Sequence, residues 1–351
     1  MPTSAAVYDC KGPSLTASER DFFRDADPWG FILFARHCET SQQMLKLCAE
    51  LRESVGRETP ILIDQEGGRV ARMRSRDGKN PEWRDHPPMA VFGDLWRLDP
   101  GKAQEAAWLN GYLLGDMVRT CGVNVNCAPM LDVRQLDSDP VTIGDRAIAM
   151  HSDIVAPIGA AIMAGLQVGG SLPIIKHMPG LGRASCDSHY ELPIVPAKHS
   201  DLAGSDFVPF KYLSDLSHSA PMGMTGHVVY PDLDPENCVT HSTIIIQEII
   251  RGEIGFKGLL FSDDLKMEAL GGHYRERAEK ALKAGCDIAL ACNFSLKEKQ
   301  EIAQGVGALT PEASLRAEAA LNWKSTMQAP EVERSYRALQ ELLKPVWPLM
   351  A

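Results

Sequence analysis

The stretch Gly258-Leu259-Leu260-Phe261-Ser262-Asp263-Asp264-Leu265 decides the fold of this 351-residue chain. Its first half is a short apolar run that begins at a glycine, which is typical of a strand buried on both faces of a parallel sheet. Asp263 and Asp264 follow where that strand ends. Carboxylates at the carboxyl ends of barrel strands stand where such folds carry their catalytic groups. The stretch therefore predicts a parallel α/β fold with functional side chains at the strand ends.

Two adjacent aspartates also fit a simpler role. Asp is a preferred N-cap residue, because its carboxylate accepts a hydrogen bond from a free N–H group in the first helical turn. We therefore expect Asp264 to cap a helix that begins near Leu265. Asp263 is then left to face a cleft.

Further apolar runs of strand length lie on both sides of this stretch and alternate with helical patterns such as 42–55, 101–120 and 275–284. The expected strands are 5–10, 30–35, 60–66, 124–129, 173–178, 221–227, 258–264 and 288–293. Eight such strands close a (β/α)8 TIM-type barrel, with an open doubly wound sheet as the alternative. Helical periodicity at 312–323 and 331–343 predicts helices outside the barrel. No linker or repeat divides the chain, so we expect one domain over residues 1–351.

One segment could be mistaken for a membrane span. Residues 154–175 carry no charged side chain over 22 positions, which is long enough to cross a bilayer. Pro157, Gly169-Gly170 and Pro173 interrupt the segment. These breaks predict a buried helix, a turn and a core strand.

The loop after the expected strand 173–178 carries an unusual load of titratable side chains. It reads Lys176-His177-Met178-Pro179-Gly180-Leu181-Gly182-Arg183-Ala184-Ser185-Cys186-Asp187-Ser188-His189. In an extended backbone, residues two apart point the same way, so Asp187 can hold the imidazole of His189. Such a carboxylate sets the tautomer of a histidine base and stabilises its protonated form. For an isolated Asp-x-His, a solvated loop is the simpler interpretation.

Five sequence blocks in this order resemble those of a known family. They are Ile63-Asp64-Gln65-Glu66-Gly67-Gly68-Arg69-Val70, Ile143-Gly144-Asp145-Arg146, the Lys176–His189 loop, Met224-Thr225-Gly226-His227, and Ser262-Asp263-Asp264-Leu265. In these blocks the chain resembles the single-domain β-N-acetylglucosaminidases of glycoside hydrolase family 3, enzymes of bacterial peptidoglycan recycling. The resemblance runs from about residue 30 to residue 293.

The resemblance implies a retaining β-N-acetylhexosaminidase that removes terminal N-acetylglucosamine from β-1,4-linked GlcNAc–anhydro-MurNAc fragments. It makes Asp263 the nucleophile that forms a covalent glycosyl–enzyme, and His189 the general acid/base oriented by Asp187. The sugar would be held by a set of polar residues: Asp64, Arg72, Arg146, Lys176 and His177. The resemblance implies no cofactor and no metal. The chain departs from the family pattern at Leu181, where a His is usual, and at Ala147-Ile148, where Ser-Phe is usual.

Two other functions use the same residues. A barrel metallohydrolase could bind a metal through His177, His189, His227 and Asp263. Such barrels commonly carry a His-x-His pair on the first strand, and this chain has none. A catalytically inactive sugar-binding protein is the other alternative, and Leu181 is the feature that suggests it. His227 itself could equally be a hydrogen-bonded wall residue.

Charge and composition limit the classes of binding partner and the cellular location. The formal net charge is −10 with both signs spread along the chain, which argues against nucleic acid and against a polybasic membrane anchor. The nine cysteines include no Cys-x-x-Cys pair, and residues 1–30 lack the apolar core of a secretory signal. Both observations predict a reducing, cytoplasmic location without disulfides. We expect a monomer that acts on a small saccharide.

Overall fold

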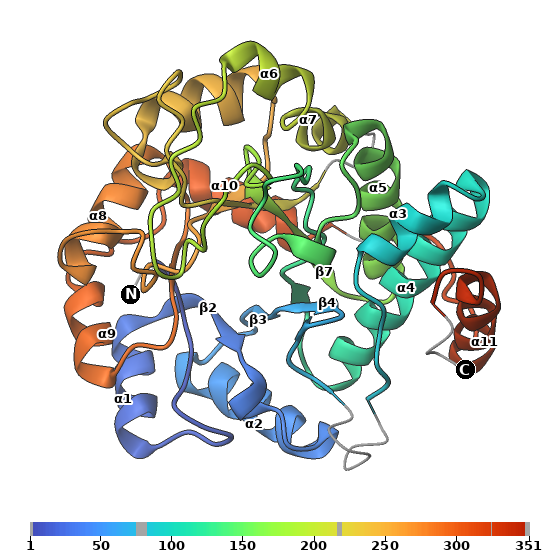
Figure 1. Cartoon of the computed structure of the whole chain (residues 1–351). Coiled ribbons are helices and arrows are strands. Elements are labelled where there is room, and N and C mark those ends of the chain that lie inside the picture. The colour runs from blue at the N-terminus through green and yellow to red at the C-terminus, as the bar shows by residue number, and fades with distance from the viewer. Residues whose placement is uncertain (1–2, 75–82, 216–219, 324, 348–351) are drawn as a thin grey trace.

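Eight parallel strands form the centre of the molecule (Figure 1). The computed structural model describes residues 3–74, 83–215, 220–323 and 325–347. The strands run in the order β10-β1-β2-β3-β6-β7-β8-β9, and a parallel bridge between Phe261 and Ile288 joins the two ends of this sheet. Their bounds are β1 (Ser4–Tyr8), β2 (Pro28–Leu33), β3 (Ile61–Ile63), β6 (Val125–Asn126), β7 (Leu172–Met178), β8 (Met222–Thr225), β9 (Leu259–Phe261) and β10 (Ala289–Ala291). The expected TIM-type barrel is confirmed, and the open-sheet alternative is wrong.

The seam between β9 and β10 is closed partly by a side chain. The Ser262 N–H donates to the Ile288 carbonyl at 2.9 Å. The Ser262 Oγ in turn accepts the N–H of Leu290 at 2.9 Å. A hydroxyl therefore takes the place of one backbone acceptor at this seam.

Alternation along each strand divides the core into two parts. Leu259 and Phe261 of β9 point into the barrel, where Phe261 lies edge-on to Trp29 with ring centroids 5.4 Å apart. Leu260, between them, belongs to the larger cluster under the surrounding helices. Strand residues alternate between the two faces of a sheet, so a run apolar at every position fills both clusters.

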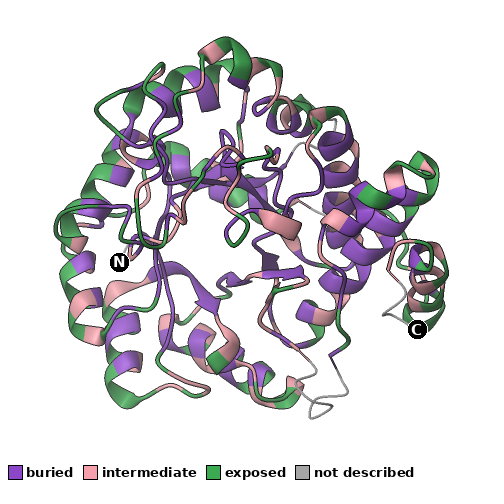
Figure 2. Ribbon diagram, viewed as in Figure 1, coloured by how far each residue is buried: buried purple, intermediate pink, exposed green. Residues whose placement is uncertain are grey.

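Most of the helices lie in a ring outside the strands, with their buried faces turned inward (Figure 2). The helices are α1 (Ala17–Ala26), α2 (Ser41–Val55), α3 (Ala90–Trp96), α4 (Pro100–Thr120), α5 (Ser152–Val168), α6 (His199–Gly204), α7 (Val208–Asp215), α8 (Tyr274–Ala284), α9 (Leu296–Ala303), α10 (Pro311–Leu321) and α11 (Val332–Leu343), with a π-helical segment at Ile245–Glu253. Helix α10 instead lies behind the strands in Figure 1, and its Ala317 and Ala320 pack in the barrel-interior cluster. The sequence starts the helices at N-caps: Thr16 forms a capping box with Glu19, and Asp99 precedes Pro100 at the start of α4. The five helical patterns expected from the sequence match α2, α4, α8, α10 and α11.

The charge-free segment at 154–175 forms helix α5, a turn at Gly169-Gly170 and strand β7, as its breaks predict. Helix α5 packs closely on α4, because a Cβ at Gly165 would lie 2.1 Å from the Trp108 carbonyl oxygen. In the described ranges, no helix combines the length and apolar character needed to cross a membrane. All nine cysteines are free thiols, as expected.

Two local expectations need correction. Asp264 does not cap a helix near Leu265, because the chain there forms turns and the next helix, α8, begins at Tyr274. Its Oδ1 instead accepts the N–H groups of Lys266 at 3.0 Å and Cys292 at 3.2 Å, so it ties this turn to the end of β10. The expected strand 60–66 is also split, since β3 ends at Ile63. Its continuation, β4 (Gln65–Gly67), pairs antiparallel with β5 (Val70–Ala71).

Candidate active site

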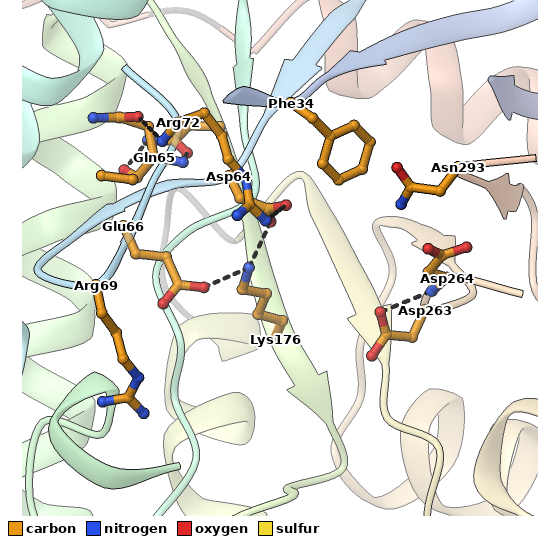
Figure 3. A network of polar contacts seen from close by, with 12 residues as sticks. Phe34, Asp64, Gln65, Glu66, Arg69, Arg72, Lys176, Asp263, Asp264 and Asn293 are labelled. Carbon is orange, nitrogen blue, oxygen red and sulfur yellow. Dashed lines mark hydrogen bonds and ion pairs between the residues drawn. The ribbon is translucent and has the colours of Figure 1, made fainter. Parts of the chain in front are cut away.

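A cavity of about 290 Å³ lies at the carboxyl ends of the barrel strands. Every candidate site residue from the sequence lines it: Asp64, Arg72, Arg146, Lys176, His177, Asp187, His189 and Asp263. The positions come from separate strand ends and loops, and the barrel brings them together because the carboxyl ends of parallel strands share one face. Phe34 and Asn293 lie on the same cavity (Figure 3).

Lys176 is the centre of a buried ion-pair network. Its Nζ, on β7, lies 2.9 Å from Asp64 Oδ1 and 2.7 Å from Glu66 Oε1 (Figure 3). Arg72 binds the other oxygen of Asp64 at 2.9 Å. Arg146 holds Glu66 through two hydrogen bonds of 2.9 and 2.8 Å. We call Asp64, Glu66, Arg72, Arg146 and Lys176 the sugar clamp, after the role that the sequence resemblance implies for four of them.

The charges of the sugar clamp stabilise one another. Burial alone would raise the pKa of Glu66, but Arg146 and Lys176 outweigh it and lower that pKa to about 2. Lys176 and Arg72 likewise overcome burial and hold the pKa of Asp64 well below its usual range. Burial would lower the pKa of Lys176, yet its two carboxylate partners raise it. All of these groups are therefore ionised at neutral pH and present fixed donors and acceptors to the cavity.

His177 is held from behind by a carboxylate. Its Nδ1 lies 2.7 Å from Oδ2 of the fully buried Asp132, whose Oδ1 accepts the N–H of Leu181. Leu181, where the family pattern has His, is buried. Its side chain lies beside Gly226, because a Cβ added to Gly226 would be 3.6 Å from Leu181 Cδ1. Asp132 was not among the residues predicted from the sequence, and Glu66 was not singled out as a site residue. A lone acid in the apolar run Met130-Leu131-Asp132-Val133 was a usable signal, because buried carboxylates need partners.

Asp263 and Asp264 have opposite electrostatic environments. Burial would raise the pKa of Asp263, but His177, His227 and the N–H of Asp264, 2.8 Å from its Oδ1, lower it. Asp263 therefore faces the cavity as a carboxylate. Burial raises the pKa of Asp264 to about 7, and the negative charge of Asp263 adds to this shift.

His227 is a wall residue. Its Nδ1 lies 2.8 Å from Thr240 Oγ1 and its Nε2 lies 3.0 Å from the Asp264 carbonyl oxygen. The ring is fully buried, and burial lowers its pKa. His227 thus supports the turn after β9 instead of facing the cavity.

His189 and Asp187 form the predicted pair at the cavity rim. His189 Nδ1 lies 2.7 Å from Asp187 Oδ1, and the same oxygen accepts the backbone N–H of His189 at 2.9 Å. Burial would raise the pKa of Asp187, but its contacts with His189 lower it. The His189 side chain is 63% exposed. Because Nδ1 binds Asp187, Nε2 is the ring nitrogen available to a substrate.

The geometry does not support a metal centre. Within residues 3–74, 83–215, 220–323 and 325–347, no group of three or more His, Cys, Asp or Glu side chains could hold a metal ion. Of the residues in the metallohydrolase alternative, His227 uses both ring nitrogens in hydrogen bonds to the protein.

A barrel with an ionised carboxylate in its mouth, a histidine–aspartate pair at the rim and a clamp of fixed polar groups defines a hydrolytic enzyme for a polar, sugar-like substrate. The profile of the glycosyl hydrolase family 3 N terminal domain matches residues 15–321. The chain belongs to this family.

Named relatives and a solved structure agree with this family assignment. The chain is 36% identical over 295 residues to the β-hexosaminidase of Bordetella avium, covering 84% of this chain and 81% of that protein. It is 37% identical over 289 residues to the β-hexosaminidase of Nitrosomonas eutropha, covering 82% and 80%. NagZ from Neisseria gonorrhoeae, solved with N-trifluoroacetyl-D-glucosamine, superposes with a TM-score of 0.85 at 31% identity over 100% of this chain and 99% of that one. The protein is thus a glycoside hydrolase of the β-N-acetylhexosaminidase type, as the sequence resemblance implied.

Proposed function

We propose that this protein is a retaining β-N-acetylglucosaminidase that acts through a covalent glycosyl–enzyme on Asp263. The observation that carries the proposal is the pairing of two groups in one cavity. Asp263 lies half-buried on the cavity wall with a lowered pKa, and the His189–Asp187 pair lies at the rim. An ionised carboxylate suits a nucleophile, and an exposed imidazole suits proton exchange with a leaving group and with water.

The reaction has two displacements. Asp263 attacks the anomeric carbon while His189 Nε2 gives its proton to the departing glycosidic oxygen, so the β-glycosidic bond breaks and an α-linked ester forms. Water then attacks that ester, and His189 takes a proton from the water. Two inversions leave the product β-configured. Asp187 keeps Nδ1 protonated and stabilises the imidazolium. Histidine suits both steps, because its unperturbed pKa of about 6.5 lies near the working pH.

The sugar clamp and His177 are proposed to hold the N-acetylglucosamine. A site built from paired polar groups discriminates strongly, because an analogue that lacks one hydroxyl or amide leaves buried groups unpaired. Support comes from the N. gonorrhoeae structure, which contains an N-acylated glucosamine and matches nearly the full length of this chain. A β-N-acetylglucosaminidase of the same family from Paenibacillus is also similar, with a TM-score of 0.83 at 25% identity over 96% of this chain and 66% of that one.

We further propose a cellular location and a natural substrate. The sequence resemblance points to GlcNAc–anhydro-MurNAc muropeptide fragments in cell-wall recycling. The nine cysteines, none of which forms a disulfide, fit a reducing cytoplasm, and we propose that the protein works as a monomer.

A panel of aryl β-glycosides tests the sugar specificity. Equal kcat/KM for the glucoside and the N-acetylglucosaminide would contradict the proposed preference for N-acetylglucosamine. Adding phosphate to the same assay distinguishes hydrolysis from phosphorolysis by the product formed.

The nucleophile is tested by Asp263→Ala. We expect turnover of an aryl β-N-acetylglucosaminide to be nearly abolished while the thermal melt stays cooperative. Proton NMR of the wild-type reaction should show β-N-acetylglucosamine as the first product, before mutarotation. If α-N-acetylglucosamine appears first, the covalent mechanism is wrong.

A further inference from the structure

The loop that carries His189 is supported by the loop between β6 and α5 (residues 127–151). The Asp139 N–H donates to the Ala184 carbonyl at 2.8 Å, and the Ser138 hydroxyl donates to the Gly182 carbonyl. The two backbones touch at Gly182, where a Cβ would lie 2.1 Å from the Val133 carbonyl oxygen. The acid/base loop is therefore docked on this second loop along several residues.

Thr142, in the supporting loop, lines the cavity that Asp187 and His189 also line. The residue is only 6% exposed. Its backbone is fixed on both sides, because its N–H donates to Asp139 Oδ1 and its carbonyl accepts Arg146 Nη1 at 2.6 Å. Yet within the described part of the chain, its Oγ1 makes no hydrogen bond of normal geometry. A buried hydroxyl without a partner costs free energy, so this one calls for an explanation.

The nearest explanation is Asp187. Both hydrogen bonds from His189 end on Asp187 Oδ1, which leaves Oδ2 as the oxygen that can accept a further donor. The Thr142 hydroxyl lies close enough to contribute to the lowered pKa of Asp187, after the opposing effect of burial and the larger effects of His189. Thr142 and Asp187 also line one cavity, on two loops that hydrogen-bond to each other.

We propose that Thr142 is a positioning residue of the acid/base pair, whose hydroxyl donates to Asp187 Oδ2 and keeps Oδ1 on His189 Nδ1. This inference rests on the proposed function of His189 and Asp187. With the carboxylate held at both oxygens, the imidazole stays aligned and Nε2 stays directed at the glycosidic oxygen. Since the Thr142 carbonyl also binds Arg146, one loop joins a sugar-clamp residue to the acid/base pair.

Two substitutions separate a hydrogen bond from packing. Thr142→Val keeps the shape of the side chain and removes the hydroxyl, whereas Thr142→Ser keeps the hydroxyl and removes the methyl group. The substrate is chitobiose, whose sugar leaving group needs a proton. Thr142→Val should lower kcat/KM by about tenfold, the low end for losing a hydrogen bond to a charged group, and Thr142→Ser by no more than about twofold. With a nitrophenyl glycoside, the glycosylation step should change little in either variant.

If Thr142→Ser lowers kcat/KM more than Thr142→Val does, Thr142 acts by packing. A Thr142→Val variant with wild-type kcat/KM would also overturn the proposal. A double-mutant cycle identifies the partner. Thr142→Val should cause no further loss in an Asp187→Ala background. A persistent tenfold loss there would mean that Thr142 acts on the substrate directly. If Asp187→Ala alone leaves chitobiose cleavage intact, the acid/base assignment fails, which is a different result.

Discussion

The sugar clamp and the acid/base loop face the same cavity but are built in opposite ways. Lys176 and Glu66 are 3% and 2% exposed, and each is fixed by two charged partners. His189 is mostly exposed and is held by a single side chain, Asp187. One region is a set of largely buried ion pairs, contributed by strands and loops. The other is a hydrogen-bonded pair on a loop.

The difference fits the roles proposed for the two regions. A group that recognises one sugar gains from being fixed before the sugar arrives, because less ordering remains at binding. Burial makes the sugar clamp rigid and also makes each of its charges dependent on its partner. An acid/base has to reach a leaving group and then water, so it lies where both have access. The two regions should therefore respond differently to the loss of one side chain.

The largest effect should come from Lys176→Ala. Removing this cation leaves Asp64 and Glu66 buried with less compensation, which should cost about 3–5 kcal/mol of unfolding free energy. Loss of a preorganised donor should also lower kcat/KM for an aryl N-acetylglucosaminide by about a thousandfold. Chemical denaturation and initial rates, both measured well below the melting temperature, test the two effects.

Lys198 is a matched control, because it pairs with Asp232 at the same 2.9 Å distance on the surface. Lys198→Ala should leave both the melting temperature and the activity unchanged, since exposed ion pairs contribute little. Equal destabilisation by the two substitutions would remove the distinction between the buried clamp and the surface.

His189→Ala should affect activity alone. With chitobiose in its N,N′-diacetyl form, kcat/KM should fall by about a hundredfold or more, the usual contribution of general acid catalysis. With a nitrophenyl leaving group, which needs no proton, the glycosylation step should lose much less. The melting temperature should barely change, because the side chain is exposed. His199→Ala is the control: this histidine is also exposed and binds Glu253 at 2.6 Å, but it lies outside the cavity. Equal losses on both substrates would mean that His189 is not the acid.

The smallest effect concerns Asp264, a half-buried acid held by two backbone N–H groups instead of a cation. Burial raises its pKa to about 7, above the ordinary value of about 3.9 for the unfolded chain. Its contribution to stability is therefore complete below pH 4 and is lost as the pH rises through 7. The Asn side chain in Asp264→Asn cannot ionise, so this variant is the reference. The melting temperature of the wild type minus that of the variant should fall by a few degrees between pH 5 and pH 8. If this difference does not change with pH, the pKa of Asp264 is not raised.

Sequence patterns predicted the barrel because most strands contain a short run of apolar residues, such as Ile61–Ile63 and Leu259–Phe261. Such a run can be recognised without knowing which strands lie beside it. The patterns predicted the site because polar residues follow those strands directly. They could not pair the charges: Arg146 meets Glu66 across 80 positions and Lys176 meets Asp64 across 112. The cap expected at Asp264 failed for a related reason. Its partners include the N–H of Cys292, 28 residues away on the next strand end.

The side-chain closure at Ser262 has a consequence for how the barrel opens. Backbone hydrogen bonds of Ile288 hold one end of this seam, and the Ser262 hydroxyl holds the amide of Leu290. A hydrogen bond to a side chain can open when that side chain rotates, so local opening and amide exchange should begin there. Asp263 is the next residue, so a local opening that separates β9 from β10 also displaces the proposed nucleophile. The amide of Leu290, which donates to the Ser262 hydroxyl, should then exchange with solvent faster than amides in the middle of β7. Its exchange rate would report how often the enzyme loses its catalytic geometry while most of the barrel stays folded.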